Sequence, residues 1–177
     1  MKIFIAGPRA VSKLNSEVIM RLENIINNDF FVLVGDANGI DKAIQKYYDE
    51  RKYQNVIVYA AGEQVRNNIG NWNTTKVKAT NGIKGFDFYA LKDKQMAIDA
   101  DYGLMIWNGK SKGTFNNIIN LVKLNKIVLL YLIPNKKFYK IQNMNDIENL
   151  VRTVNSVDIN KFFIEKTRDD KQLILKI

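Results

Sequence analysis

Short apolar segments alternate along the chain with stretches whose apolar residues recur every three or four positions, and this alternation constrains the fold more than any other feature. The apolar segments occupy residues 2–6, 30–34, 55–60, 102–107 and 127–133. Continuous apolar runs of this length are typical of parallel strands that are covered on both faces. The alternation of strand and helix predicts βαβ units and a parallel sheet.

The expected architecture is an open α/β sheet of Rossmann-like build, mostly parallel, with helices on both faces. The expected helices lie at residues 14–26, 40–48, 93–100, 115–122 and 145–154. Asp93 is the expected N-cap of the third helix. We expect one domain over residues 1–177, with its core in residues 1–133. Residues 134–177 are expected to form a C-terminal extension of one helix and a hairpin, whose strands are 161–166 and 172–177.

Residues 61–89 interrupt this rhythm. The segment is rich in Asn, Gly and Thr and contains Arg66 and Trp72. Loops this long are usually functional or disordered. Two interpretations stay open: Trp72 stacks on a ligand base as the segment closes over it, or Trp72 packs into the core.

Neither cysteine nor histidine occurs among the 177 residues, which removes whole classes of chemistry. Zinc sites built on Cys and His, Ser-His-Asp triads and Cys-His pairs are excluded. Any general acid or base must be Asp, Glu, Lys or Tyr. The sequence predicts no bound metal and no resident cofactor.

No apolar run in the sequence reaches the length of about 20 residues that a membrane span needs. The N-terminus also lacks the apolar stretch of a signal peptide. We therefore expect a cytoplasmic protein that makes no contact with a membrane.

The net charge of +9 favours polyanions or phosphorylated ligands as partners. No acidic residue occurs from Tyr102 to Asn145, whereas seven lysines do. These are Lys110, Lys112, Lys123, Lys126, Lys136, Lys137 and Lys140. Three interpretations of these lysines stay open: a surface that aids solubility, a face that binds phosphate, or a contact with nucleic acid.

Three strand-to-helix loops combine glycines with residues suited to phosphate or sugar. In an open parallel sheet, ligands bind outside the carboxyl ends of the strands, where the strand order reverses. The first loop contains Gly7, which lets the backbone approach a ligand, and Arg9, which can bind a phosphate through two parallel hydrogen bonds. The alternative is a plain turn with a solvated arginine.

The second loop covers residues 35–41. Gly35 and Gly39 bracket a turn that opens a helix, whose free N–H groups would attract an anion. Asp36 can accept hydrogen bonds from a ribose diol, and Asn38 is a further candidate contact. Asp41 either caps the helix or orients the loop. Capping and turn chemistry alone would also explain the pattern.

The third loop precedes the helix at 115–122. Its candidate residues are Gly109, Lys110, Ser111, Gly113 and Thr114. Glycines, hydroxyls and lysines at a helix start favour a phosphate cradle, although Thr114 can instead be an N-cap. The Gly-x-x-x-x-Gly-Lys-Ser/Thr order of a P-loop is absent. Together the three loops predict an electropositive hollow fit for a sugar phosphate.

These loops resemble the SLOG superfamily, which includes DprA-like, YpsA-like and LOG proteins. Residues 35–43 look like its Gly-Gly-Ala-Arg-Gly-Ala-Asp segment. A second block is similar in type and spacing at Met96-Ala97, Ala100-Asp101 and Gly113-Thr114. The resemblance covers residues 1–133. It implies a Rossmann-like nucleotide-binding fold whose members hydrolyse nucleoside monophosphates, sense nucleotide-derived signals or bind DNA.

LOG enzymes carry an Arg four residues before the Met and a Glu three residues after the Thr. Those positions are Lys92 and Asn117 here, so the resemblance adds both to the candidate ligand-binding residues. Asn117 lacks the carboxylate that would stabilise an oxocarbenium-like state, which argues against LOG-type phosphoribohydrolase activity. Pro8 stands where the superfamily has Ser, and Gly7-Pro8 is similar to nucleoside 2-deoxyribosyltransferase-like proteins.

The favoured hypothesis is a homo-oligomeric binding protein that senses or sequesters a nucleotide or nucleotide-derived signal, such as an ADP-ribose-like molecule or a cyclic nucleotide. The first alternative is an N-glycosyl hydrolase or transferase. Its essential carboxylate would come from Asp36, Asp41, Glu63, Asp87 or Asp101. The second alternative is single-stranded DNA binding, which the charge supports although no aromatic stacking platform stands out.

Overall fold

The computed structural model describes residues 1–78 and 85–154. Its centre is a seven-stranded sheet in the order β4-β3-β2-β1-β5-β6-β7. The strands are β1 (Lys2–Ala6), β2 (Phe31–Gly35), β3 (Val56–Ala61), β4 (Asn73–Val77), β5 (Tyr102–Trp107), β6 (Val128–Leu132) and β7 (Lys137–Ile141). All neighbouring strands pair in parallel except β6 and β7, which are antiparallel.

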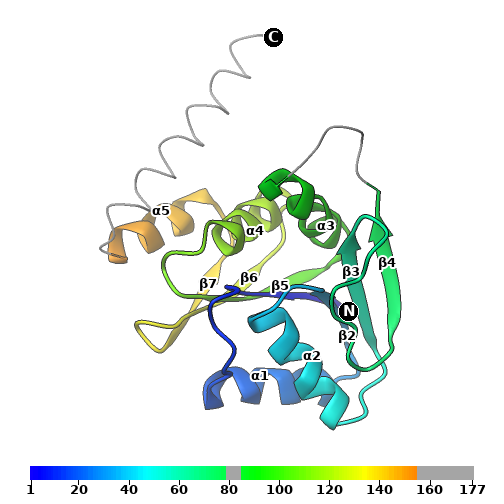
Figure 1. Ribbon diagram of the computed structural model, residues 1–177. Helices are drawn as coiled ribbons and strands as arrows, with labels where there is room; N and C mark the ends of the chain where they lie inside the picture. Colours follow the sequence, from blue (N-terminus) through cyan, green and yellow to red (C-terminus); the bar gives the residue numbers. More distant parts are fainter. Residues whose placement is uncertain (79–84, 155–177) are drawn as a thin grey trace.

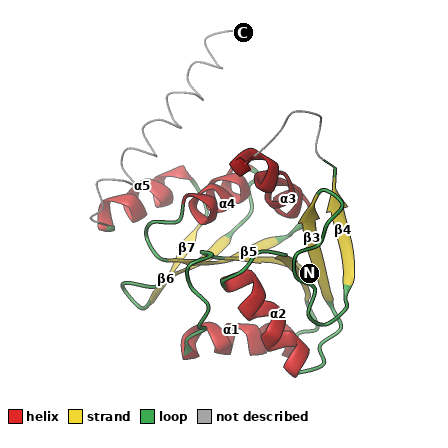
Figure 2. Ribbon diagram, viewed as in Figure 1, coloured by secondary structure: helices red, strands yellow, loops and turns green. Residues whose placement is uncertain are grey.

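Helices cover both faces of the sheet (Figure 1). They are α1 (Ser16–Asn27), α2 (Ile40–Glu50), α3 (Gly85–Asp99), α4 (Lys112–Lys123) and α5 (Met144–Thr153). The first two lie on one face and the other three on the opposite face, so the sheet forms the middle layer (Figure 2). The predicted Rossmann-like α/β fold is confirmed.

The two-sided cover explains why the central strands read as continuous apolar runs. Phe4 packs into the core beneath α3 and α4, while Ile3 and Ile5 join the core on the side of α1 and α2. Because successive side chains of a strand point to opposite faces, both sets must be apolar.

Two edge strands and one helix differ from the prediction. β7 (Lys137–Ile141) lies before the C-terminal helix, where no strand was predicted. β4 lies within the segment predicted to be irregular, and α3 begins at Gly85 rather than near Asp93. Asp93 is therefore inside the helix, and its expected role as N-cap is wrong. β4 has the polar sequence NTTKV, and its side chains are partly or fully exposed. An edge strand of this kind lacks the apolar run by which buried strands are found.

The predicted C-terminal helix is confirmed as α5. It begins with a capping box in which Asn143 and Asp146 bind each other's backbone N–H groups. The predicted hairpin at residues 161–166 and 172–177 lies outside the described residues. Within residues 1–78 and 85–154, no helix combines the length and the apolar character needed to cross a membrane.

The connection from β3 to β4 is held firmly against α2. Gln45 is fully buried; its Nε2 donates to Gly35 O at 2.9 Å and to Asn67 O at 3.2 Å, and its Oε1 accepts from Ile69 N at 3.0 Å. Trp72 lies in the core on the α1 and α2 side, and its Nε1 donates to Tyr53 O at 2.8 Å. Of the two interpretations of Trp72, core packing is the one found.

Candidate ligand-binding site

A pocket of about 520 Å³ lies beyond the carboxyl ends of the central strands. β1 leads to α1 on one face, whereas β5 leads to α4 on the opposite face (Figure 1). The strand order therefore reverses between β1 and β5, and a crevice opens there, as in other open α/β sheets. The lining residues come from the loop after β1, the loop before α2 and its first turn, α3 from Gly85 to Met96, and the first turns of α4.

The start of α4 forms one side of the pocket. Ser111 is the N-cap, and its Oγ accepts hydrogen bonds from Thr114 N at 3.3 Å and from Thr114 Oγ1 at 3.0 Å. Ser111, Gly113 and Thr114 all line the pocket. First-turn amides of a helix have no acceptor within the helix and carry partial positive charge. This side can therefore bind an anion.

Among the described residues, none crowds Gly113. A Cβ placed there would have one described neighbour, Phe86 Cε2, at 4.0 Å. Glycine inside a helix costs roughly 0.5–1 kcal/mol relative to alanine. Its presence at the wall of the pocket leaves space for a ligand to approach the backbone closely.

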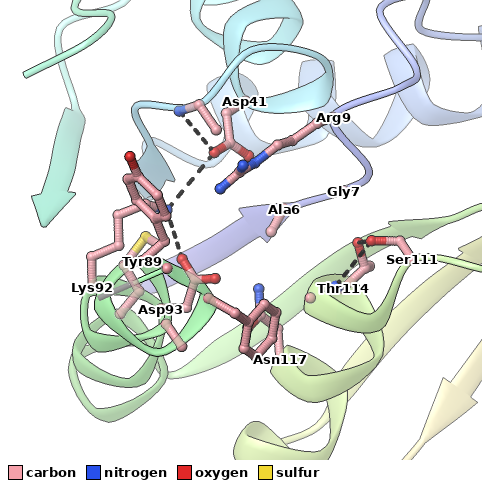
Figure 3. A pocket seen from close by; sticks show the side chains of 16 residues that line it. Ala6, Gly7, Arg9, Asp41, Tyr89, Lys92, Asp93, Ser111, Thr114 and Asn117 are labelled. Atoms are coloured by element: carbon pink, nitrogen blue, oxygen red, sulfur yellow. Dashed lines mark hydrogen bonds and ion pairs between the residues drawn. The ribbon is translucent and has the colours of Figure 1, made fainter. Parts of the chain in front are cut away.

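Asn117 lies one turn further along α4 and also lines the pocket (Figure 3). Its side chain is buried, and its Oδ1 has no hydrogen-bond partner. Among the described residues it is the one buried, unpartnered polar group that lines the pocket. Leaving such an atom unpaired costs about 1–3 kcal/mol, a cost that a donor group on a ligand would remove.

A cluster of charged residues forms the other side of the pocket (Figure 3). The ammonium group of Lys92 lies 2.6 Å from Asp93 Oδ1 and 4.0 Å from Asp41 Oδ2. Asp41 Oδ2 also accepts a hydrogen bond from Ala37 N at 3.3 Å. Gly35 lies directly beneath, where a Cβ would come within 2.5 Å of Lys92 Nζ. The glycine is therefore required for Asp41 and Lys92 to approach each other.

Burial determines how these groups titrate. It raises the pKa of Asp41 to about 6, although the nearby Lys92 acts to lower it. Burial acts to lower the pKa of Lys92, but the carboxylates of Asp93 and Asp41 outweigh it, so this pKa lies above its ordinary value. The lysine is therefore charged at neutral pH, and Asp41 exchanges its proton close to physiological pH.

Arg9 reaches the pocket from the loop after β1. Its guanidinium lies 5.0 Å from the centre of the Tyr89 ring, and that of Arg66 lies 4.5 Å from the same ring. Arg66 is committed to the buried Asp36, which accepts from its backbone N at 3.1 Å, from its Nε at 2.9 Å and from its Nη2. Burial acts to raise the pKa of Asp36, but the Arg66 hydrogen bonds outweigh it and lower that pKa. Arg9 is thus the arginine left to meet a ligand.

The structure brings most of the predicted site residues together. Those that line the pocket are Gly7, Arg9, Asp41, Lys92, Ser111, Gly113, Thr114 and Asn117. Those outside its lining are Gly35, Asp36, Asn38, Gly39, Gly109 and Lys110. Asp36 and Asn38 instead bind the connection between β3 and β4: Asn67 Nδ2 donates to Asp36 O at 2.7 Å and to Asn38 Oδ1 at 3.3 Å. The second loop is thus mostly structural.

The described residues that line the pocket carry both signs of charge, whereas the sequence predicted an electropositive hollow. Its charged lining residues are Arg9, Lys92, Asp41 and Asp93. The seven lysines of the acid-free stretch are also spread out, since Lys123 is the last residue of α4 and Lys126 Nζ donates to Ala97 O at 2.7 Å. The expectation of an electropositive hollow is wrong because carboxylates from α2 and α3 enter the same space.

One of the five carboxylates considered for catalysis lines the pocket among the described residues, namely Asp41. Glu63 pairs with Lys76 on the surface, and Asp101 accepts from Lys2 N at the opposite end of β1. The pocket also contains Asp93, Phe86 and Tyr89 from α3, which sequence reasoning did not select. A helical stripe from Phe86 through Tyr89 and Asp93 to Met96, at spacings of three and four, was the available signal.

Comparisons with known proteins support the fold. No family model matches the chain, and no curated protein matches its sequence. The structure is similar to DNA processing protein A from Helicobacter pylori, with a TM-score of 0.59, 14% sequence identity, and coverage of 96% of this chain and 81% of that one. That protein is described by its single-stranded DNA binding mode.

A second solved structure, the structural genomics target TM1055, matches with a TM-score of 0.46 and 19% identity over 73% of each chain. At these identities the likeness concerns the fold alone.

Proposed function

We propose that this protein binds a nucleotide, or a nucleotide-derived phosphorylated small molecule, in the pocket between β1 and β5, as a sensor or sequestering protein. The observation that carries the proposal is Gly113, a helix-start glycine beside open space at the wall of the pocket. A phosphate can reach the first-turn amides of α4 through that space. Arg9 supplies the matching charge, and Asn117 an amide for a sugar or base.

Native mass spectrometry and calorimetry with adenosine 5′-monophosphate, cyclic adenosine monophosphate and ADP-ribose test this proposal. We expect at least one of these probes to bind, and Gly113→Val to weaken its binding by at least about tenfold, because the new side chain occupies the phosphate position. Lys94→Ala, on the exposed side of α3, is the control and should bind normally. The proposal fails if none of the probes binds to the native protein.

Turnover of the ligand is the first alternative, and one observation favours it. Asp41 and Asp93 share the pocket, and burial raises the pKa of Asp41 to about 6. A carboxyl with that pKa can act as a general acid. Chromatography of the same probes after incubation tests this alternative: release of free base supports an N-glycosyl hydrolase, and intact nucleotide supports a binding protein.

Single-stranded DNA binding is the second alternative. The fold matches a protein described by its single-stranded DNA binding mode, and the net charge is +9. Fluorescence anisotropy with a labelled oligonucleotide tests it. An affinity that falls steeply with salt supports a phosphate-backbone contact, and Gly113→Val should not affect that affinity if the DNA lies outside the pocket.

A further inference from the structure

Among the described residues, the charges that line the pocket nearly cancel one another. Arg9, Lys92, Asp41 and Asp93 all border the same space. The ammonium of Lys92 already lies against both carboxylates, at 2.6 Å from Asp93 and 4.0 Å from Asp41. Of the positive charge on the described lining residues, the guanidinium of Arg9 and the partial charge at the start of α4 are left for a ligand.

Asp41 is one of the two carboxylates that line the pocket among the described residues. Charged groups surround it from the neighbouring elements: Lys92 and Asp93 from α3, Asp36 from the preceding loop, Arg66 from the β3–β4 connection, and Arg9 from the loop after β1. Arg66 is neutralised by Asp36, with which it forms an ion pair. Asp41 is also buried, so the surrounding water screens its charge poorly.

We propose that this pocket selects its ligand by charge, and that Asp41 is the residue that sets the limit. The pocket accepts a phosphate group with one negative charge, which is either a phosphodiester or a monoester that binds together with one proton. One charge is matched by Arg9 and the start of α4. A second charge is repelled by the carboxylates of Asp41 and Asp93. This inference rests on the proposed function and narrows its ligand class.

Proton uptake is the consequence for a phosphate monoester. The second pKa of a phosphate monoester is about 6, so the free ligand is mostly a dianion above neutral pH. Burial raises the pKa of Asp41 to a similar value. A monoester that binds at higher pH must therefore bring a proton, either on its own phosphate or on Asp41. A phosphodiester carries one charge across this range and needs no such proton.

Calorimetry with two matched probes tests the inference: adenosine 5′-monophosphate and its methyl ester, which differ by one charge. At about pH 8 we expect the methyl ester to bind at least about tenfold more tightly. At about pH 5.5 we expect the two affinities to agree within about threefold, because the monoester is then protonated.

Two variants identify the residue responsible. Asp41→Asn keeps the size of the side chain and removes its charge, so it should raise the affinity for the monophosphate at about pH 8 by about tenfold and close the gap between the probes. Asp49→Asn makes the same change at an exposed position on the same helix and should leave the gap unchanged. A gap that survives in Asp41→Asn would overturn the role of Asp41.

The native protein gives an independent readout that does not depend on the folding of a variant. Titrations near pH 7.5 in buffers with different heats of ionisation should show that the monophosphate takes up roughly one proton more than the methyl ester. Equal proton uptake, or equal affinity at about pH 8, would overturn charge selection while leaving the proposed function standing. If neither probe binds, and cyclic adenosine monophosphate and ADP-ribose also do not bind, the proposed function itself fails.

Discussion

The starts of α2 and α4 both carry a glycine and both point toward the same ligand pocket, yet their glycines have opposite surroundings. Gly39 precedes α2 with a φ of +81°, and a Cβ there would lie 2.5 Å from Arg9 Cα. Gly113 lies in the first turn of α4 next to open space. The first glycine is required by the fold, whereas none of the described residues would clash with a side chain at the second. A helix-start glycine is thus a binding signal only when the structure leaves space beside it.

The hydrogen bonding of polar groups also differs between the starts of α2 and α4. The Ile40 N–H at the start of α2 donates to Pro8 O at 3.3 Å, and Asp36 and Asn67 hold the preceding loop. At the start of α4, Ser111 is the N-cap and the adjacent wall is open. The start of α2 is hydrogen-bonded to the rest of the protein, whereas the start of α4 borders the pocket.

The largest expected effect is the loss of stability when the start of α2 is disrupted. Gly39→Ala places a side chain at positive φ and against the backbone of Arg9, so we expect a loss of at least about 3 kcal/mol in the free energy of unfolding. Urea denaturation followed by circular dichroism measures it. A variant as stable as the native protein would show that this glycine is not required.

The next effect concerns the charge in the first turn of α2. The pKa of Asp41 is raised from 3.8 to about 6, so the folded state prefers the protonated form. The ionised carboxylate therefore costs stability above about pH 6, and this cost is absent below about pH 4. Relative to Asp41→Asn, the native protein should lose about 3 kcal/mol of unfolding free energy as the pH rises from below about 4 to above about 6. Parallel curves of stability against pH for the two proteins would contradict this.

A smaller effect tests the cap of α4. Ser111→Ala removes the acceptor for Thr114 N and should cost about 1 kcal/mol of stability. Thermal unfolding monitored by calorimetry suits a change of this size. Ser111→Asp is the matched control, since aspartate is also a good N-cap and should retain most of the stability.

The smallest expected change in stability has the opposite sign. It distinguishes the two glycines, Gly39 and Gly113, most directly. Gly113→Ala should leave stability unchanged or raise it by up to about 1 kcal/mol, because alanine favours helix and its Cβ meets open space. Ligand binding should weaken at the same time. A clear loss of stability in Gly113→Ala would show that the fold requires this glycine, as it requires Gly39.

Sequence reasoning found most of the pocket because strand-to-helix loops of a parallel sheet meet at one edge. Arg9, Asp41 and Thr114 were selected from their positions after predicted strands, and all three line the pocket. It missed Asp93 because the start of α3 was placed too late along the chain, which turned a residue of the helix interior into an apparent cap. The error began with β4, whose polar residues gave no apolar run.

The sequence by itself determined the parallel α/β architecture and the edge of the sheet at which the loops converge, because apolar periodicity and turn residues are local properties of the chain. The tertiary structure decided which glycine is crowded and which is open, and which charges already have partners. Those properties depend on atoms brought from distant parts of the chain, such as Arg66 beside Asp36 and Lys92 between Asp41 and Asp93. The space and the charge balance in the pocket therefore depend on tertiary packing, and local sequence patterns do not predict them.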